Sequence, residues 1–135
     1  MSSWLEIILR FLLAAGLGAG NGYQRERAGK AAGLRTHILV SSGAALFTLV
    51  SIYGFSGAVV DISRVAAGVV VGIGFIGAGV ILRGQREKEV AGLTTAATIW
   101  ITAAVGLAVG AGMYWISVIA TAVTVGVLFL PKVRG

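Results

Sequence analysis

The sequence predicts an all-α protein, a polytopic bundle of about five transmembrane helices. Hydrophobic residues make up 57% of the 135-residue chain, charged residues only 12%, and the mean hydropathy is +0.94. Apolar runs near the roughly 20 residues needed to cross a bilayer recur between short polar segments. A soluble domain of this size would have too little interior for so much apolar surface. We therefore expect one membrane domain covering residues 1–135.

The expected spans are residues 4–23, 37–53, 63–82, 94–110 and 113–130. Trp4 and Tyr23 border the first span, where aromatic side chains suit the membrane interface. Asp61 and Ser63 precede or open the third span and are candidate caps for it. The apolar run of residues 96–130 is too long for a single crossing, so we divide it just after Gly110.

Glycines at helical spacing predict close contacts between helix backbones in lipid. The expected packing glycines are Gly16, Gly18, Gly20 and Gly22 in the first span, and Gly68, Gly72, Gly74, Gly77 and Gly79 in the third. Because the third span carries glycine on two faces, we expect it at the centre of the bundle. The faces of the first span, or Gly106–Gly110 of the fourth, would then bind a second copy. A homodimer is the expected assembly.

The string Gly72-x-Gly74-x-x-Gly77 also matches a dinucleotide-binding fingerprint. That fingerprint requires a preceding strand and a βαβ unit, whereas these glycines lie inside one apolar run. Nucleotide binding is therefore not expected.

Basic residues fall mainly on one side of the expected spans, as in cytoplasmic loops. That side receives Arg25, Arg27, Lys30, Arg35, Arg83, Arg86, Lys88, Lys132 and Arg134. The other side receives Arg64 alone, so we expect the N-terminus outside and the C-terminus in the cytoplasm. This distribution explains the net charge of +6 without a nucleic-acid partner.

A polar cluster on the expected cytoplasmic side is the first candidate binding site. It comprises Arg25, Glu26, Arg35, Thr36, His37, Thr94 and Thr95. Arginine forks suit carboxylate or phosphate oxygens, and Glu26 is the expected partner of Arg35. The alternative is a topology anchor that contacts anionic lipid headgroups. The two threonines would either cap the fourth span or line a polar cavity at its mouth, and capping is favoured.

A second polar group is expected near the outer surface. Glu6 and Arg10 are four residues apart and share a helix face, and Asp61 and Arg64 lie on the same side of the membrane. Ionisable groups inside a membrane are candidates for function, but Arg10 is near enough to the surface to extend toward water.

The sequence offers few other side chains that could bind a metal or catalyse a reaction. The chain has no cysteine, and the single histidine, His37, excludes a multi-histidine metal site. We expect no cofactor, no metal and no enzymatic reaction.

Several motifs in order resemble the MgtC/SapB family of bacterial membrane proteins. They are Gly22-Tyr-Gln-Arg25-Glu26, Ala32-Gly33-Leu34-Arg35-Thr36-His37, Asp61-Ile-Ser-Arg64, the glycine-rich run Gly72 to Ile81, and Gly92-Leu93-Thr94-Thr95-Ala96-Ala97. The chain is similar to short, SapB-like members without a soluble C-terminal domain. It departs from the family at Gln24, usually acidic, and at Gly68 and Val71, where polar residues are common.

The resemblance implies a small, multi-pass regulatory or stress-adaptation protein of the bacterial inner membrane that acts through contacts between helices. Relatives are linked to growth at low magnesium and to survival of pathogens in macrophages. Some act on other membrane proteins, including the ATP synthase or transporters. The alternative is a transporter or channel for an ion or small solute.

Overall fold

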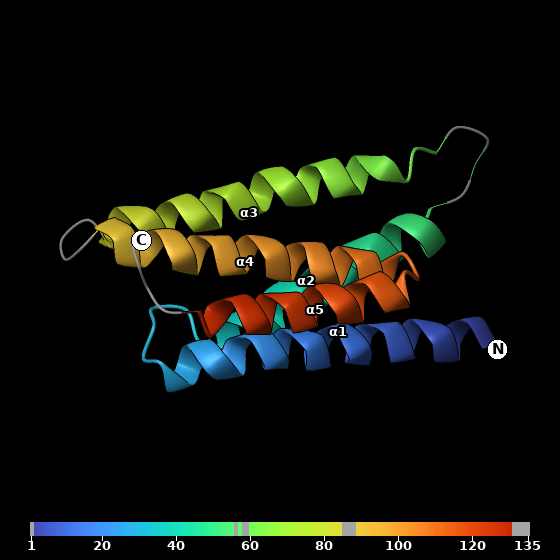
Figure 1. The fold of residues 1–135 in the computed structure, drawn as a ribbon. Helices are drawn as coiled ribbons and strands as arrows, with labels where there is room; N and C mark the ends of the chain where they lie inside the picture. Colours follow the sequence, from blue (N-terminus) through green and yellow to red (C-terminus); the bar gives the residue numbers. More distant parts are fainter. Residues whose placement is uncertain (1, 56, 58–59, 85–88, 131–135) are drawn as a thin grey trace.

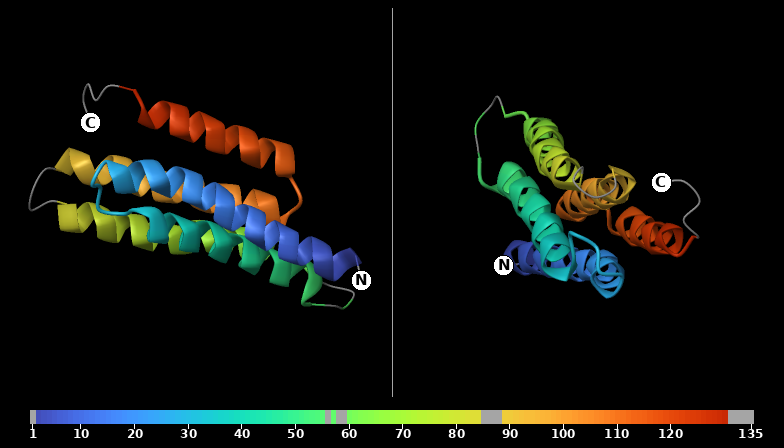
Figure 2. Two further views of the ribbon diagram at one scale, coloured as in Figure 1. Left: turned by 90° about the horizontal axis from the view of Figure 1, so that it is seen from below. Right: turned by 90° about the vertical axis from the view of Figure 1, so that its left-hand side faces the viewer.

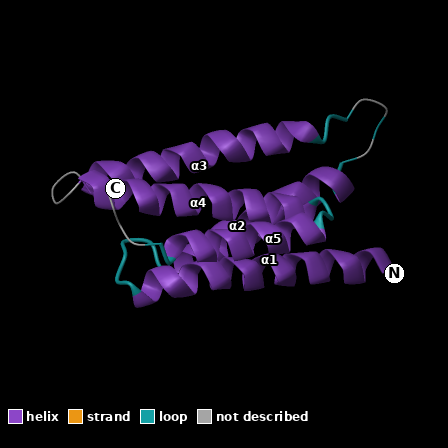
Figure 3. Ribbon diagram, viewed as in Figure 1, coloured by secondary structure: helices purple, strands orange, loops and turns teal. Residues whose placement is uncertain are grey.

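The computed structural model is all-helical in the part of the chain that it describes, residues 2–55, 57, 60–84 and 89–130. Its five helices are α1 (Ser2–Arg27), α2 (Leu34–Tyr53), α3 (Ser63–Gly84), α4 (Glu89–Gly110) and α5 (Tyr114–Leu128) (Figure 1; Figure 3). Of the basic residues used for the orientation argument, Arg86, Lys88, Lys132 and Arg134 lie outside the described residues, as does the side chain of Arg83.

Successive helices run in opposite directions, and α4 occupies the middle of the bundle. It packs against α1, α2, α3 and α5, whereas α3 lies at an edge with α4 as its main neighbour (Figure 2). The end of α1 therefore lies at the same end of the bundle as the starts of α2 and α4 (Figure 1). We call this the Arg25 end and the opposite one the Arg10 end.

Four of the five helices contain a segment long and apolar enough to cross a membrane. The segments are Trp4–Arg27, Leu34–Tyr53, Ser63–Leu82 and Gly92–Gly110. The fifth helix, α5, has 15 residues. At about 1.5 Å per residue, α5 is shorter than the roughly 30 Å hydrocarbon layer. The fifth expected span, over 113–130, corresponds to this shorter apolar helix.

Glycines bring the backbones of α1, α2 and α4 into direct contact. A Cβ atom built on Gly18 would lie 2.6 Å from the carbonyl oxygen of His37, and one on Gly106 would lie 2.1 Å from that of Ser41. Gly22 and Gly110 approach α2 in the same way. These four positions are therefore used inside the chain. Gly18–Gly22 and Gly106–Gly110, expected to bind another subunit, instead join α1 and α4 to α2.

The expected central position of α3 is also wrong. Nothing lies within 4 Å of a Cβ built on Gly68, Gly72, Gly74 or Gly79, and only Gly77 meets a neighbour, Ala96 at 3.6 Å. Glycine spacing shows which helix faces can be approached closely, but it does not show which helix approaches them. In the first span Gly16 is equally open, and Gly20 makes only an ordinary contact with Thr121.

Candidate functional site

Polar side chains are buried between α1, α2 and α4, in the half of the bundle nearest the Arg25 end. The outermost contact joins the Nη2 of Arg25 to the Oγ1 of Thr95 over 2.9 Å. The side chain of Arg25 is only 3% exposed. Arg25 and Thr95, which the sequence placed on the same side of the membrane, are thus in direct contact.

His37 forms the next contact inward and is completely buried. Its Nδ1 lies 2.8 Å from the carbonyl oxygen of Gly33, so this nitrogen carries a proton. Its Nε2 lies 3.1 Å from the Oγ1 of Thr98. That hydroxyl also lies 2.8 Å from the carbonyl oxygen of Thr95. In the neutral imidazole, Nε2 accepts the Thr98 proton. In the charged imidazole, Nε2 donates and Thr98 donates to Thr95.

Asn21 makes the innermost of the three contacts. Its Nδ2 donates to the Oγ1 of Thr102 over 3.0 Å, and both side chains are fully buried. Thr95, Thr98 and Thr102 recur at three- and four-residue spacing and thus share one face of α4. Sequence reasoning missed Thr98 and Thr102. Their spacing from Thr95 was the available signal. We call these contacts, with Arg25, His37 and Asn21, the polar ladder.

The other predicted members of the cluster lie outside the polar ladder. Glu26 is exposed, and its Oε1 accepts the backbone N–H of Leu34 at the start of α2 over 3.0 Å. Arg35 is exposed and Thr36 half-buried. Within the described side chains, no ion pair joins Glu26 to Arg35. The expected pairing is absent because Glu26 caps the amino end of α2.

Thr94 is half-buried, beside the fully buried Thr95, and both make further polar interactions. The structure therefore brings together Arg25, His37 and Thr95 of the predicted cluster. It does not bring Glu26 or Arg35 into that contact set.

The Arg10 end is closed by a separate ionic network. Arg10 pairs with Glu6 one turn earlier in α1. It also donates to the carbonyl oxygen of Gly110 over 2.8 Å and to the hydroxyl of Tyr114 over 2.9 Å. The Tyr114 hydroxyl in turn donates to Glu6 over 2.9 Å, and the ring of Tyr53 lies 5.9 Å from the guanidinium. This network connects α1 to α2 and to the α4–α5 turn.

Asp61 and Arg64 do not take part in that network. The carboxylate of Asp61 accepts the hydroxyl of Ser63 over 2.7 Å and its backbone N–H over 3.1 Å. These hydrogen bonds, with a smaller contribution from Arg64, lower the pKa of Asp61. Asp61 thus stabilises the start of α3, as the sequence predicted.

An apolar layer separates the polar ladder from the Arg10 network. Ala14, Ala45, Val105 and Val109 form this layer and are all buried. Hydroxyls facing the bundle from α5, such as Ser117 and Thr121, donate to carbonyl groups one turn earlier in their own helix. The described residues therefore show two polar regions separated by packed methyl groups.

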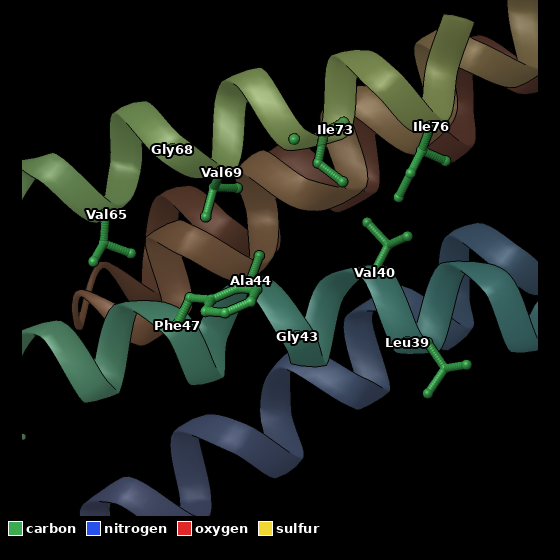
Figure 4. A pocket seen from close by; sticks show the side chains of 11 residues that line it. Leu39, Val40, Gly43, Ala44, Phe47, Val65, Gly68, Val69, Ile73 and Ile76 are labelled. Carbon is green, nitrogen blue, oxygen red and sulfur yellow. The ribbon is translucent and has the colours of Figure 1, made fainter. Parts of the chain in front are cut away.

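The described residues contain no group of three or more histidine, aspartate or glutamate side chains placed to hold a metal. They do form an apolar groove of about 620 Å³ between α2 and α3. Val40 and Gly43 line it from α2, and Gly68, Gly72 and Ile76 line it from α3 (Figure 4).

Comparison with known proteins assigns the family. The MgtC family profile matches residues 11–134. The Escherichia coli K12 protein named "Putative magnesium transporter YhiD" is 48% identical over 129 residues, which cover 91% of this chain and 59% of YhiD. SrpB of Synechococcus elongatus is 45% identical, over 87% of this chain and 70% of SrpB. MgtC of Salmonella typhimurium is 45% identical, over 79% of this chain and 44% of MgtC.

The chain thus spans little more than half of YhiD and less than half of MgtC. No solved structure matches it. The family profile covers the whole of the polar ladder, the apolar layer and α3. The chain belongs to the MgtC family of membrane proteins.

Proposed function

We propose that this protein is a multi-pass protein of the bacterial inner membrane that acts by contacting other membrane proteins, in adaptation to low magnesium. Its N-terminus lies outside, and the Arg25 end faces the cytoplasm. Family membership and the names of YhiD and MgtC support the link to magnesium. The proposed partners are a second copy of the chain and larger assemblies such as transporters or the ATP synthase. No catalysed reaction is part of this proposal.

The exposed face of α3 is the observation that carries the proposal. In the bundle interior, glycine is used where backbones touch, as at Gly18 and Gly106. On α3, Gly68 and Gly72 form a small-xxx-small pair on the side that lines the open groove next to α2, and nothing lies within 4 Å of a Cβ atom at either position. Without a hydrophobic force between helices in lipid, close van der Waals contact is a main source of association. This face is therefore suited to a helix from another chain.

Transport of magnesium is the second candidate, supported by the name of YhiD and by the buried polar ladder. Two features count against a cation path through this interior. The ladder ends at the apolar layer around Ala14 and Val105, and its outermost member is the cation Arg25. A buried positive charge at the mouth of a path repels a divalent cation.

Photo-cross-linking in native membranes tests the contact proposal. A photoreactive residue replaces Val71 on α3, 63% exposed, or the control Leu9 on α1, 55% exposed. We expect discrete adducts at Val71 only. Gly72→Leu should abolish them without unfolding the protein, because nothing lies within 4 Å of that site.

Magnesium entry into proteoliposomes loaded with a fluorescent indicator provides the second measurement. We expect the same rate as in empty liposomes. Saturable entry, together with equal labelling at Val71 and Leu9, would overturn the contact proposal in favour of transport.

A further inference from the structure

Arg25 is a buried cation without a carboxylate partner among the described residues. Its one hydrogen bond to a side chain goes to the neutral Thr95. Its Nε is buried and has no hydrogen-bond partner. Arginine stays protonated in proteins, so burial cannot remove the charge. A buried charge left uncompensated is strongly unfavourable. The described side chains therefore leave this charge without the anion that would stabilise it.

In the part of the chain that the structure describes, the side chains around Arg25 do not supply that anion. Glu26 is the next residue in the helix, about 100° round the axis, and it caps α2 at Leu34. His37, which is neutral or positive, is the ionisable group that α2 contributes nearby. Thr95, the residue of α4 in contact with Arg25, is uncharged.

Other buried atoms near the polar ladder also lack partners. They are the Oδ1 of Asn21, the Oε1 of Gln24 and the Oγ of Ser41. Asn21 precedes Arg25 by one helical turn and therefore shares its face of α1. The Nε of Arg25, a donor, and the Oδ1 of Asn21, an acceptor, are thus both without a partner and lie one helical turn apart. This arrangement suits a ligand that can both accept and donate hydrogen bonds.

The position of Arg25 along its helix indicates what the anion is. It lies in the last turn of α1, where Arg27 and, in the loop that follows, Lys30 add positive charge. Basic pockets between transmembrane helices on the cytoplasmic side, where we place the Arg25 end in our proposal, bind the phosphate headgroups of lipids. Arginine binds phosphate oxygens through several parallel hydrogen bonds. A protonated oxygen of inorganic phosphate, or a glycerol hydroxyl of the phosphatidylglycerol headgroup, can also donate to the free acceptor of Asn21.

We propose that Arg25 and Asn21, between α1, α2 and α4, form a binding site for a phosphate group, supplied by inorganic phosphate or by an anionic lipid. The site is separate from the exposed face of α3. The proposal does not rest on the proposed contact function.

Thermal unfolding in dodecyl maltoside, a detergent without phosphate, tests the site. One arm adds inorganic phosphate and the other adds phosphatidylglycerol. Sodium chloride at matched ionic strength is the reference. We expect a saturable upward shift of the midpoint by several degrees in at least one arm, and the responding arm identifies the source. Arg25→Gln should lose this shift. Arg27→Gln, an exposed cation two residues away, should keep it.

Phosphorus NMR of the unmodified protein gives a readout that does not depend on a variant folding. We expect saturable broadening or a shift of the phosphate signal, and a weaker effect with Arg25→Lys, which keeps the charge without the planar fork. The proposal is overturned if neither arm stabilises the unmodified protein beyond chloride, or if Arg27→Gln loses the response as fully as Arg25→Gln. The contact proposal would remain intact in either case.

Discussion

Replacing Gly106 by alanine should destabilise the bundle, although alanine is the better helix former. A Cβ at this position would lie 2.1 Å from the carbonyl oxygen of Ser41 and 2.9 Å from its Cα. An ordinary contact begins near 3.4 Å, so the two atoms are about 1.3 Å too close. Both neighbouring atoms are backbone, so no side-chain rotation can relieve the clash. The helices α2 and α4 must separate.

The size of the effect follows from two opposing contributions. Alanine gains about 1 kcal/mol over glycine in helix propensity. Overpacking of a close contact costs about 1–3 kcal/mol, and occasionally more. Because backbone cannot move aside locally, we expect the upper part of that range and a net loss of roughly 1–2 kcal/mol. Separation of α2 from α4 should also weaken the hydrogen bond between His37 and Thr98.

Gly72→Ala is the matched control, since the structure leaves open space at that position. We expect unchanged or slightly higher stability for it. Both variants are compared by thermal and detergent-induced unfolding, followed by circular dichroism. If Gly106→Ala is as stable as the unmodified protein while Gly72→Ala is weaker, the assignment of interior and open glycines is wrong.

The remaining predictions concern the Arg10 end and the orientation of the chain. Tyr114→Phe removes the hydroxyl bound to Arg10 and should cost about 1–2 kcal/mol of unfolding free energy, whereas Tyr23→Phe should change it by less than about 0.5 kcal/mol. Equal effects in unfolding measurements would contradict a structural role for Tyr114. Since the chain has no cysteine, Phe55→Cys and Ala31→Cys can each be labelled alone in cells. An impermeant thiol reagent should modify the first only, and the reverse pattern would invert the proposed orientation.

Hydropathy alone was sufficient to predict the helical class and the approximate spans, because lipid requires long apolar segments with internally bonded backbones. The same criterion could not show that α5 stops at Leu128, since the apolar run continues beyond it. Hydropathy also could not predict where α3 lies in the bundle, because the contacts of Gly68 and Gly72 depend on which helices are adjacent.

The polar site was predictable only where residues border the same side of the membrane. On this basis Arg25 was predicted to lie near Thr95, and in the structure a 2.9 Å hydrogen bond joins their side chains. The prediction failed for Glu26, which the helix turns away from Arg25 toward the start of α2. Tyr114 was missed because its contact with Arg10 depends on the tertiary arrangement of α1 and α5.

The two arginines inside α1 illustrate how structure separates a stabilising role from a binding role. Arg10 has a carboxylate, a hydroxyl and a backbone carbonyl as acceptors, so its charge is compensated within the chain. Arg25 is more deeply buried and contacts one neutral hydroxyl. The sequence analysis placed Arg10 inside the first span and Arg25 just beyond it, and made both candidates for function. The contacts in the structure distinguish the two. Arg10 stabilises the bundle, whereas Arg25 has no carboxylate partner among the described side chains, which makes its end of the bundle the place to look for a ligand.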